Sequence, residues 1–145
     1  MCLMLYIATS HPLSERPLPH GFAVQAVSDE EREKLRGAFS KPCLRFVGWP
    51  DACSCGFPYL PVCNEPVEYF EGLLDPADER IDEVDQAQDF LDVILDALTR
   101  DPEVELYAVW AGSEGQPPKG RREVRASRVK AGEFFVMEQW FYVFS

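Results

Sequence analysis

The chain has 145 residues, of which 46% are hydrophobic and 27% charged, which matches one domain with its own core and leaves no room for two. The net charge of −11 argues against nucleic-acid binding, because phosphate neutralisation needs clustered Lys and Arg. No stretch reaches the roughly 18 apolar residues of a membrane helix, and the first residues lack a basic leader and a cleavage site, so we expect a cytoplasmic protein without membrane contact.

The first third of the chain is predicted to hold three strands and a short helix. Cys2 to Ala8 is a continuous apolar run, typical of a strand buried on both faces in the middle of a sheet. Phe22 to Val27 and Leu44 to Trp49 predict a second and a third strand. Between them, the S-x-x-E pattern of residues 28–31 is a capping box, which predicts a short helix to about Arg36.

The middle of the chain is predicted to hold an ordered loop and the longest helix. Asp51 to Leu74 contains several prolines and no clear period, which is typical of a loop. Asp75 as N-cap and Pro76 as first helical residue predict a helix that ends near Arg100. The expected apolar face consists of Ile81, Val84, Leu91, Ile94, Leu95 and Leu98.

The last third is predicted to be mainly strands. Val104 to Trp110 alternates as a strand does, Arg122 to Val129 fits either a strand or a short helix, and Phe134 to Phe144 predicts one long strand covered on both sides. The expected fold is a single α+β domain over residues 1–145. It has a mixed, mainly antiparallel sheet of five to six strands packed on one long and one short helix.

The most suggestive motif is the C-x-C-G-F sequence of residues 53–57, which places two thiols one residue apart in a loop. Such a pair can chelate zinc or another soft metal ion, or form a strained disulfide. A closed zinc site needs four ligands, so Cys63 or Cys43 is the expected third thiol, and His11 or His20 can complete the set. The alternative is that Cys53, Cys55 and Cys63 are small, partly buried apolar residues.

Three segments together resemble a family of small bacterial proteins that has no established activity. They are the opening M-C-L-M-L-Y, the F-S-K-P of residues 39–42 and the C-x-C-G-F of residues 53–57, with E-L-Y-x-V-W from Glu105 and the aromatic C-terminus as weaker points. The resemblance spans nearly the whole chain. It implies that the cysteine loop belongs to a family pattern.

The start of the chain also resembles N-terminal-nucleophile hydrolases such as class II glutamine amidotransferases. In those enzymes removal of Met exposes a cysteine that is followed by a buried strand, and the α-amino group acts as base. This resemblance implies a minor alternative function, an amidohydrolase with Cys2 as the nucleophile.

Charge is distributed unevenly along the chain. Asp82, Asp85, Asp89, Asp92 and Asp96 recur at helical spacing and predict a solvated acidic face. The segment from Lys119 to Lys130 is basic and contains Arg121, Arg122 and Arg125. The first functional hypothesis is therefore a non-catalytic binding or regulatory domain, whose acidic face meets a basic protein partner or the basic segment of the same or a second copy. The alternative is a thiol-redox or metal-binding protein.

Overall fold

A computed structural model describes residues 2–55, 57, 59–60, 84–130 and 136–145. The strands are β1 (Leu3–Thr9), β2 (Arg16–Pro17), β3 (Ala23–Ala26), β4 (Cys43–Gly48), β5 (Tyr59–Leu60), β6 (Val104–Trp110), β7 (Gly120–Val124), β8 (Val136–Met137) and β9 (Trp140–Phe144). The helices are α1 (Asp29–Lys34), α2 (Val84–Ala97) and the short 3₁₀ turn η2 (Ala126–Arg128).

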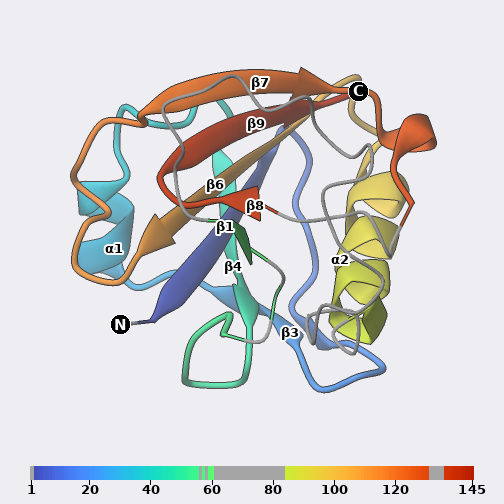
Figure 1. Cartoon of the computed structure of the whole chain (residues 1–145), viewed down its shortest axis with the longest axis horizontal. Helices are drawn as coiled ribbons and strands as arrows, with labels where there is room; N and C mark the ends of the chain where they lie inside the picture. The colour runs from blue at the N-terminus through green and yellow to red at the C-terminus, as the bar shows by residue number, and fades with distance from the viewer. Residues whose placement is uncertain (1, 56, 58, 61–83, 131–135) are drawn as a thin grey trace.

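The strands build an α+β fold around one large mixed sheet (Figure 1). Its seven strands lie in the order β2-β3-β4-β1-β6-β9-β7, one or two more strands than the sequence predicts, and β5 pairs with β8 separately. Neighbours in the large sheet run antiparallel except β7 and β9, which run parallel. The additional strands include β2, which has only two residues and is therefore too short to show an alternating sequence pattern.

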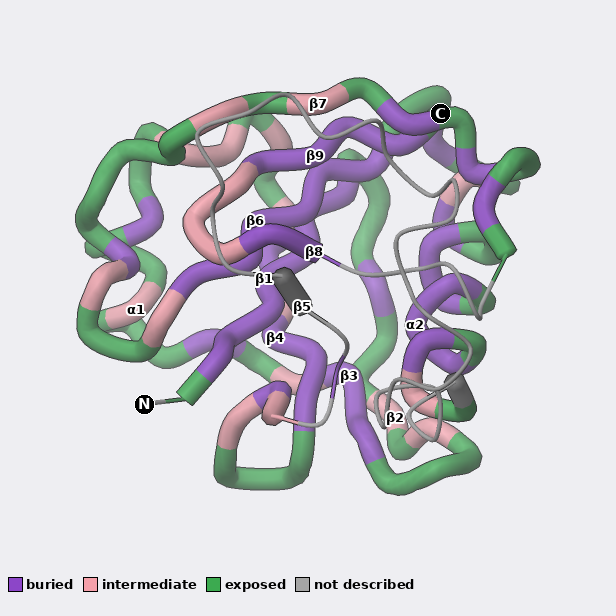
Figure 2. Tube along the Cα trace, in the orientation of Figure 1, coloured by how far each residue is buried: buried purple, intermediate pink, exposed green. Residues whose placement is uncertain are grey.

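Strand β1 lies between β4 and β6, and all of its residues are buried (Figure 2). Because side chains alternate along a strand, Leu3, Leu5 and Ile7 join the core that contains α2, whereas Met4 and Tyr6 join a second core on the other face of the sheet. The prediction of an internal first strand is confirmed. Two separate cores explain why its sequence is apolar without alternation.

Helix α2 covers the first of these cores, and its predicted apolar face is confirmed in part. Leu91 and Ile94 are buried and Leu98 is partly buried, but Leu95 is 41% exposed, which corrects the prediction. One helical residue is a rotation of about 100°, which carries Leu95 from the buried side toward Asp92 and Asp96. The predicted helix start, with Ile81, lies outside the described residues, and the helix ends at Ala97 rather than near Arg100.

The second core is closed by α1 and the segment that follows it. Ser28 and Glu31 form the predicted capping box, and Leu35 at the end of α1 is buried in this core. Farther along, the buried carboxylate of Glu105 accepts hydrogen bonds from the backbone N–H groups of Ser40 (3.0 Å) and Lys41 (3.3 Å). This carboxylate fixes the F-S-K-P segment beside the sheet.

The C-terminal region is two short strands instead of the predicted long one. The chain turns at Glu138 and Gln139, where Gln139 has a φ of 61° and its N–H donates to the carbonyl of Ala108 at 2.6 Å. Strand β8 pairs with β5, and β9 pairs with β6 and β7. The prediction failed because two adjacent polar residues inside an apolar run formed the turn.

The basic segment resolves the alternative that the sequence left open. It forms the edge strand β7 and then the 3₁₀ turn η2, so both a strand and a short helical turn are present. Among the described residues, no helix is long and apolar enough to cross a membrane.

Candidate metal centre

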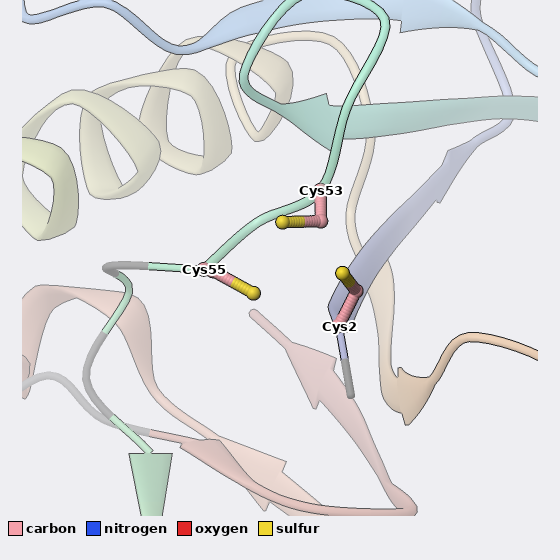
Figure 3. A group of neighbouring side chains, drawn as sticks. All are labelled: Cys2, Cys53 and Cys55. Carbon is pink, nitrogen blue, oxygen red and sulfur yellow. The ribbon is translucent and has the colours of Figure 1, made fainter.

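Three cysteines from two distant parts of the sequence converge beside the first strand. The sulfurs of Cys2, Cys53 and Cys55 all lie within 4.8 Å of one another, and Figure 3 shows them pointing into a shared space. Cys2 is exposed, whereas Cys53 and Cys55 are half-buried. We call these three residues the thiol cluster. Among the residues that the structure describes, it is the only such group of potential metal ligands.

Ser54, between the two loop cysteines, holds the loop against the sheet. Its backbone N–H donates to the carbonyl of Leu3 at 2.8 Å. Its hydroxyl accepts from the N–H of Leu5 at 3.0 Å and donates to the carbonyl of Val47 at 2.6 Å. Because Ser54 is fully buried, these bonds fix the positions of both neighbouring cysteines relative to β1 and β4.

A tight turn after β4 brings the loop back to this position. The N–H of Trp49 donates to the carbonyl of Cys53 at 2.8 Å, and the indole N–H of Trp49 donates to the carbonyl of Cys55 at 2.7 Å. Gly48 is required here, because a Cβ at this residue would lie 2.7 Å from the carbonyl oxygen of Cys53. The turn thus depends on close backbone approach.

The sulfurs of the thiol cluster influence one another strongly. The thiol of Cys55, its backbone N–H and the thiol of Cys2 all donate toward the sulfur of Cys53 and lower the pKa of Cys53, against the effect of burial. Burial, and then the sulfur of Cys53, raise the pKa of Cys55 to about 11, although the backbone N–H of Leu3 donates to Cys55 and opposes that rise.

The prediction that Cys53 and Cys55 lie together is confirmed, and of the two expected third thiols the structure corrects Cys43. Cys43 is not in the thiol cluster; its thiol donates to the carbonyl of Ser10 at 3.6 Å. Cys63 lies outside the described residues. The third thiol is Cys2, which sequence reasoning considered only as a core residue or a nucleophile. One signal could have found it: if the first and third strands pair antiparallel, the loop after the third strand returns to the residue before the first.

Neither histidine joins the thiol cluster, because each pairs with a buried aspartate. The ring Nδ1 of His11 lies 2.7 Å from Asp101, and the ring Nδ1 of His20 lies 3.0 Å from Asp89. The backbone N–H of His20 also donates to Asp89, at 2.8 Å. The two histidines therefore attach the ends of the Pro-rich loop to α2 and to the residues that follow it.

The aspartates of α2 do not form one uniform solvated face. Asp89 is only 4% exposed, which corrects the expectation for that residue, and the loop that carries His20 covers it. Asp85, Asp92 and Asp96 are exposed. Each contacts a polar side chain: His20 lies 3.8 Å from Asp85, Gln88 lies 2.7 Å from Asp92, and Arg16 lies 3.8 Å from Asp96. Asp82 lies outside the described residues.

The predicted basic site residues lie at the edge of the sheet and beyond it. The guanidinium of Arg121 is 5.1 Å from the ring centre of Phe141, and that of Arg122 is 5.9 Å from the ring centre of Trp140. Both arginines therefore pack over aromatic residues of β9 in a cation–π arrangement. Arg125 is exposed at the start of η2.

Comparisons with family models, with curated proteins and with solved structures found no match for this chain.

Proposed function

We propose that the protein binds a soft metal ion, zinc or monovalent copper, through the sulfurs of Cys2, Cys53 and Cys55. The observation that carries this proposal is the convergence of three sulfurs within 4.8 Å of one another. Sulfurs that share one zinc ion lie about 4 Å apart, since each zinc–sulfur bond is about 2.3 Å long. Small side-chain rotations suffice to close the cluster around an ion.

The donor set selects the class of ion. Thiolates favour zinc and monovalent copper over hard cations such as magnesium and calcium. Three thiolates satisfy monovalent copper in a trigonal arrangement, whereas tetrahedral zinc takes a further ligand, either water or another protein group. Because Cys2 is exposed, a water molecule can reach that fourth position. Cys63 stays a predicted additional ligand, and the variant Cys63→Ser tests that prediction.

The surroundings of the thiol cluster support metal binding in two ways. Ser54 fixes the loop to β1 and β4, so little ordering is needed when an ion binds. Backbone N–H groups of Leu3 and Cys55 donate to the sulfurs of Cys55 and Cys53. Such bonds stabilise the thiolate form that a metal ion requires.

Metal analysis and cobalt titration test this proposal. Protein purified without chelator is expected to contain close to one equivalent of zinc or copper. Titration of the reduced, metal-free protein with Co²⁺ is expected to give thiolate-to-cobalt absorption that saturates at one ion. Cys2→Ser, Cys53→Ser and Cys55→Ser each remove a ligand, so each should weaken binding by more than about 100-fold.

Cys43→Ser is the matched control, because Cys43 lies outside the thiol cluster, and it should bind Co²⁺ as the unmodified protein does. A lower affinity in Cys63→Ser would add Cys63 to the ligands. The metal proposal fails if the fully reduced protein gives no saturable cobalt signal, or if Cys2→Ser and Cys43→Ser behave alike.

A second proposal, a non-catalytic contact between the acidic face of α2 and a basic protein partner, is favoured by one observation. Leu95 is 41% exposed beside Asp92 and Asp96, so an apolar side chain lies among carboxylates. The partner is another protein or a second copy that presents Arg121, Arg122 and Arg125. Leu95 would supply the apolar contact and the aspartates the orientation.

The triple change Asp85→Asn, Asp92→Asn and Asp96→Asn tests this second proposal while leaving the buried Asp89 intact. It should weaken capture of a basic partner, or self-association, with a difference that shrinks as salt rises from about 50 to 500 mM. Pull-down and sizing experiments measure this. Identical behaviour of the triple variant and the unmodified protein at all salt concentrations would remove the acidic face as a binding surface.

A further inference from the structure

The thiol cluster can do more than bind a metal ion, because its three sulfurs lie close together at the surface of the protein. All three sulfurs lie within 4.8 Å of one another, and Cys2 is open to solvent (Figure 3). A sulfur oxidised at Cys53 therefore has a reduced thiol within reach on either side.

We propose that the thiol cluster reduces a hydroperoxide and that the product is a disulfide between Cys2 and Cys53. The inference rests on the site of the proposed function but needs no bound ion. Its substrate class is a small peroxide, which reaches the cluster from the exposed side of Cys2.

The reaction proceeds in two balanced steps. The thiolate of Cys53 attacks one peroxide oxygen, so that an S–O bond forms, the O–O bond breaks, and the other oxygen takes a proton and leaves as water or an alcohol. The sulfur of Cys2 then attacks the sulfur of Cys53. The S–S bond forms, the S–O bond breaks, and the hydroxyl leaves as water with the proton of the Cys2 thiol. The two cysteines together lose two electrons, and the peroxide gains them.

Cys2, rather than Cys55, is the partner because of how the loop is held. A bond from Cys53 to Cys55 would close a small ring across Ser54, whose backbone and hydroxyl are hydrogen-bonded to Leu3, Leu5 and Val47. Closing that ring distorts these bonds, and disulfides tolerate poor geometry only at a cost in stability. Cys2 belongs to a different segment of the chain and approaches Cys53 without this constraint.

The reaction has a consequence for a bound ion. A disulfide between Cys2 and Cys53 removes two of the three sulfur ligands, so the oxidised protein releases a metal that the reduced protein holds. Reduction of the disulfide restores the ligands. Peroxide and metal ion thus compete for the same sulfurs.

Stoichiometric oxidation tests this inference directly. The reduced, metal-free full chain is treated with one equivalent of hydrogen peroxide, its free thiols are counted, and its disulfides are mapped by mass spectrometry of peptides. We expect the loss of two of the five thiols, a bond between Cys2 and Cys53, and full recovery with dithiothreitol. Modification of Cys53 should be at least about 10-fold faster than that of Cys43.

Single variants give the controls. In Cys2→Ser the oxidised Cys53 should persist as a sulfenic acid that dimedone traps, whereas Cys43→Ser should form the disulfide as the unmodified protein does. Circular dichroism establishes that each variant is folded. The inference is overturned if the mapped bond joins Cys53 to Cys55, if no disulfide forms, or if Cys43 is oxidised as fast as Cys53.

The outcomes separate this inference from the proposed function. Saturable cobalt binding without a peroxide-driven disulfide would contradict the inference alone. A Cys2–Cys53 disulfide in a protein that binds no cobalt would contradict the metal proposal alone.

Discussion

Ser54 occupies the position between two cysteines and has no chemistry of its own in the proposed site. Its hydroxyl both accepts from β1 and donates to β4, and its N–H donates to β1, so a single small residue joins the loop to two strands. Alanine has nearly the same size but cannot make the two hydroxyl bonds. The side chain of Ser54 therefore determines how well the two neighbouring sulfurs are aligned.

Ser54→Ala is expected to destabilise the protein and weaken metal binding together. The buried N–H of Leu5 and the carbonyl of Val47 lose a partner, which costs about 1 to 3 kcal/mol of unfolding free energy. Urea unfolding measures that loss, and cobalt titration of the folded variant measures the affinity. Ser14→Ala, at an exposed residue, is the control and should change neither. Unchanged cobalt affinity in Ser54→Ala would show that the loop is positioned by other contacts.

At the scale of elements, two His–Asp pairs attach the Pro-rich segment to α2 through Asp89 and to the residues after α2 through Asp101. The pair of His20 and Asp89 is the more revealing one, because Asp89 is buried and His20 is half-exposed. The hydrogen bond to Asp89 is the main cause that raises the pKa of His20 above its ordinary value, and the charges of Asp89 and Asp85 add to it. A protonated His20 therefore fixes the loop more firmly than a neutral one.

This attachment predicts a stability that depends on pH. A histidine with a raised folded-state pKa contributes fully below its unfolded pKa of about 6.5, and that contribution is lost as pH rises through the folded value. Unfolding free energy measured in urea from about pH 6 to pH 8 should therefore fall, and His20→Gln should reduce the fall. Asp92 accepts a hydrogen bond from Gln88 and not from a histidine, so Asp92→Asn should leave the pH dependence unchanged. A steeper fall in His20→Gln would contradict this account.

The two leucines of α2 provide a matched pair for testing which face is buried. Leu91→Ala is expected to cost about 2 to 5 kcal/mol, because Leu91 lies in the core under the helix. Leu95→Ala should cost less than about 1 kcal/mol, since Leu95 is 41% exposed. Chemical denaturation of both variants measures the difference. Equal losses of unfolding free energy would show that Leu95 is buried in solution. That is the result expected if the acidic face of α2 binds a second copy of the chain.

The sequence predicts the elements whose cause is local and misses those fixed by distant contacts. The apolar run of β1 and the capping box of Ser28 are readable because burial and capping leave a direct pattern. Strand β6 is also predicted, from the alternation of its sequence, although residues 104–109 are all buried, Glu105 included. Asp89 was placed wrongly for the opposite reason. It is buried because the loop that carries His20 covers it, and that loop leaves no periodic signal. Leu95 was placed on the apolar face although its helical rotation carries it toward Asp92 and Asp96.

The thiol cluster also has one part that is predictable from local sequence and one part that depends on distant contacts. The motif identifies Cys53 and Cys55 because they are neighbours in sequence, and their proximity needs no knowledge of the fold. Cys2 joins them only through the pairing of β1 with β4, in which Leu5 lies opposite Val47. Strand pairing over such a separation is a property of the whole sheet, so the third cysteine of the thiol cluster is not visible in any local pattern.

At the scale of the whole molecule, metal binding should raise the stability of the entire domain. An ion that binds only the folded state adds about 2.7 kcal/mol when its free concentration is 100 times the Kd. The melting temperature of the reduced protein should therefore rise with added zinc and return with chelator. Cys2→Ser should lose this response and Cys43→Ser should retain it. A rise of equal size in both variants would indicate binding elsewhere.

The position of Cys2 directly before the central strand gives the cluster a topological role. Any link from Cys2 to Cys53, whether through an ion or a disulfide, closes a ring of about 50 residues that contains β1, β2, β3, α1 and β4. Such a ring restricts the unfolded chain more than a short one does, by an entropy that corresponds to about 4 kcal/mol in the chain-entropy description. The same link clamps the two strands against local opening, so amide hydrogens of β1 and β4 should exchange more slowly in the linked protein than in the reduced, metal-free protein.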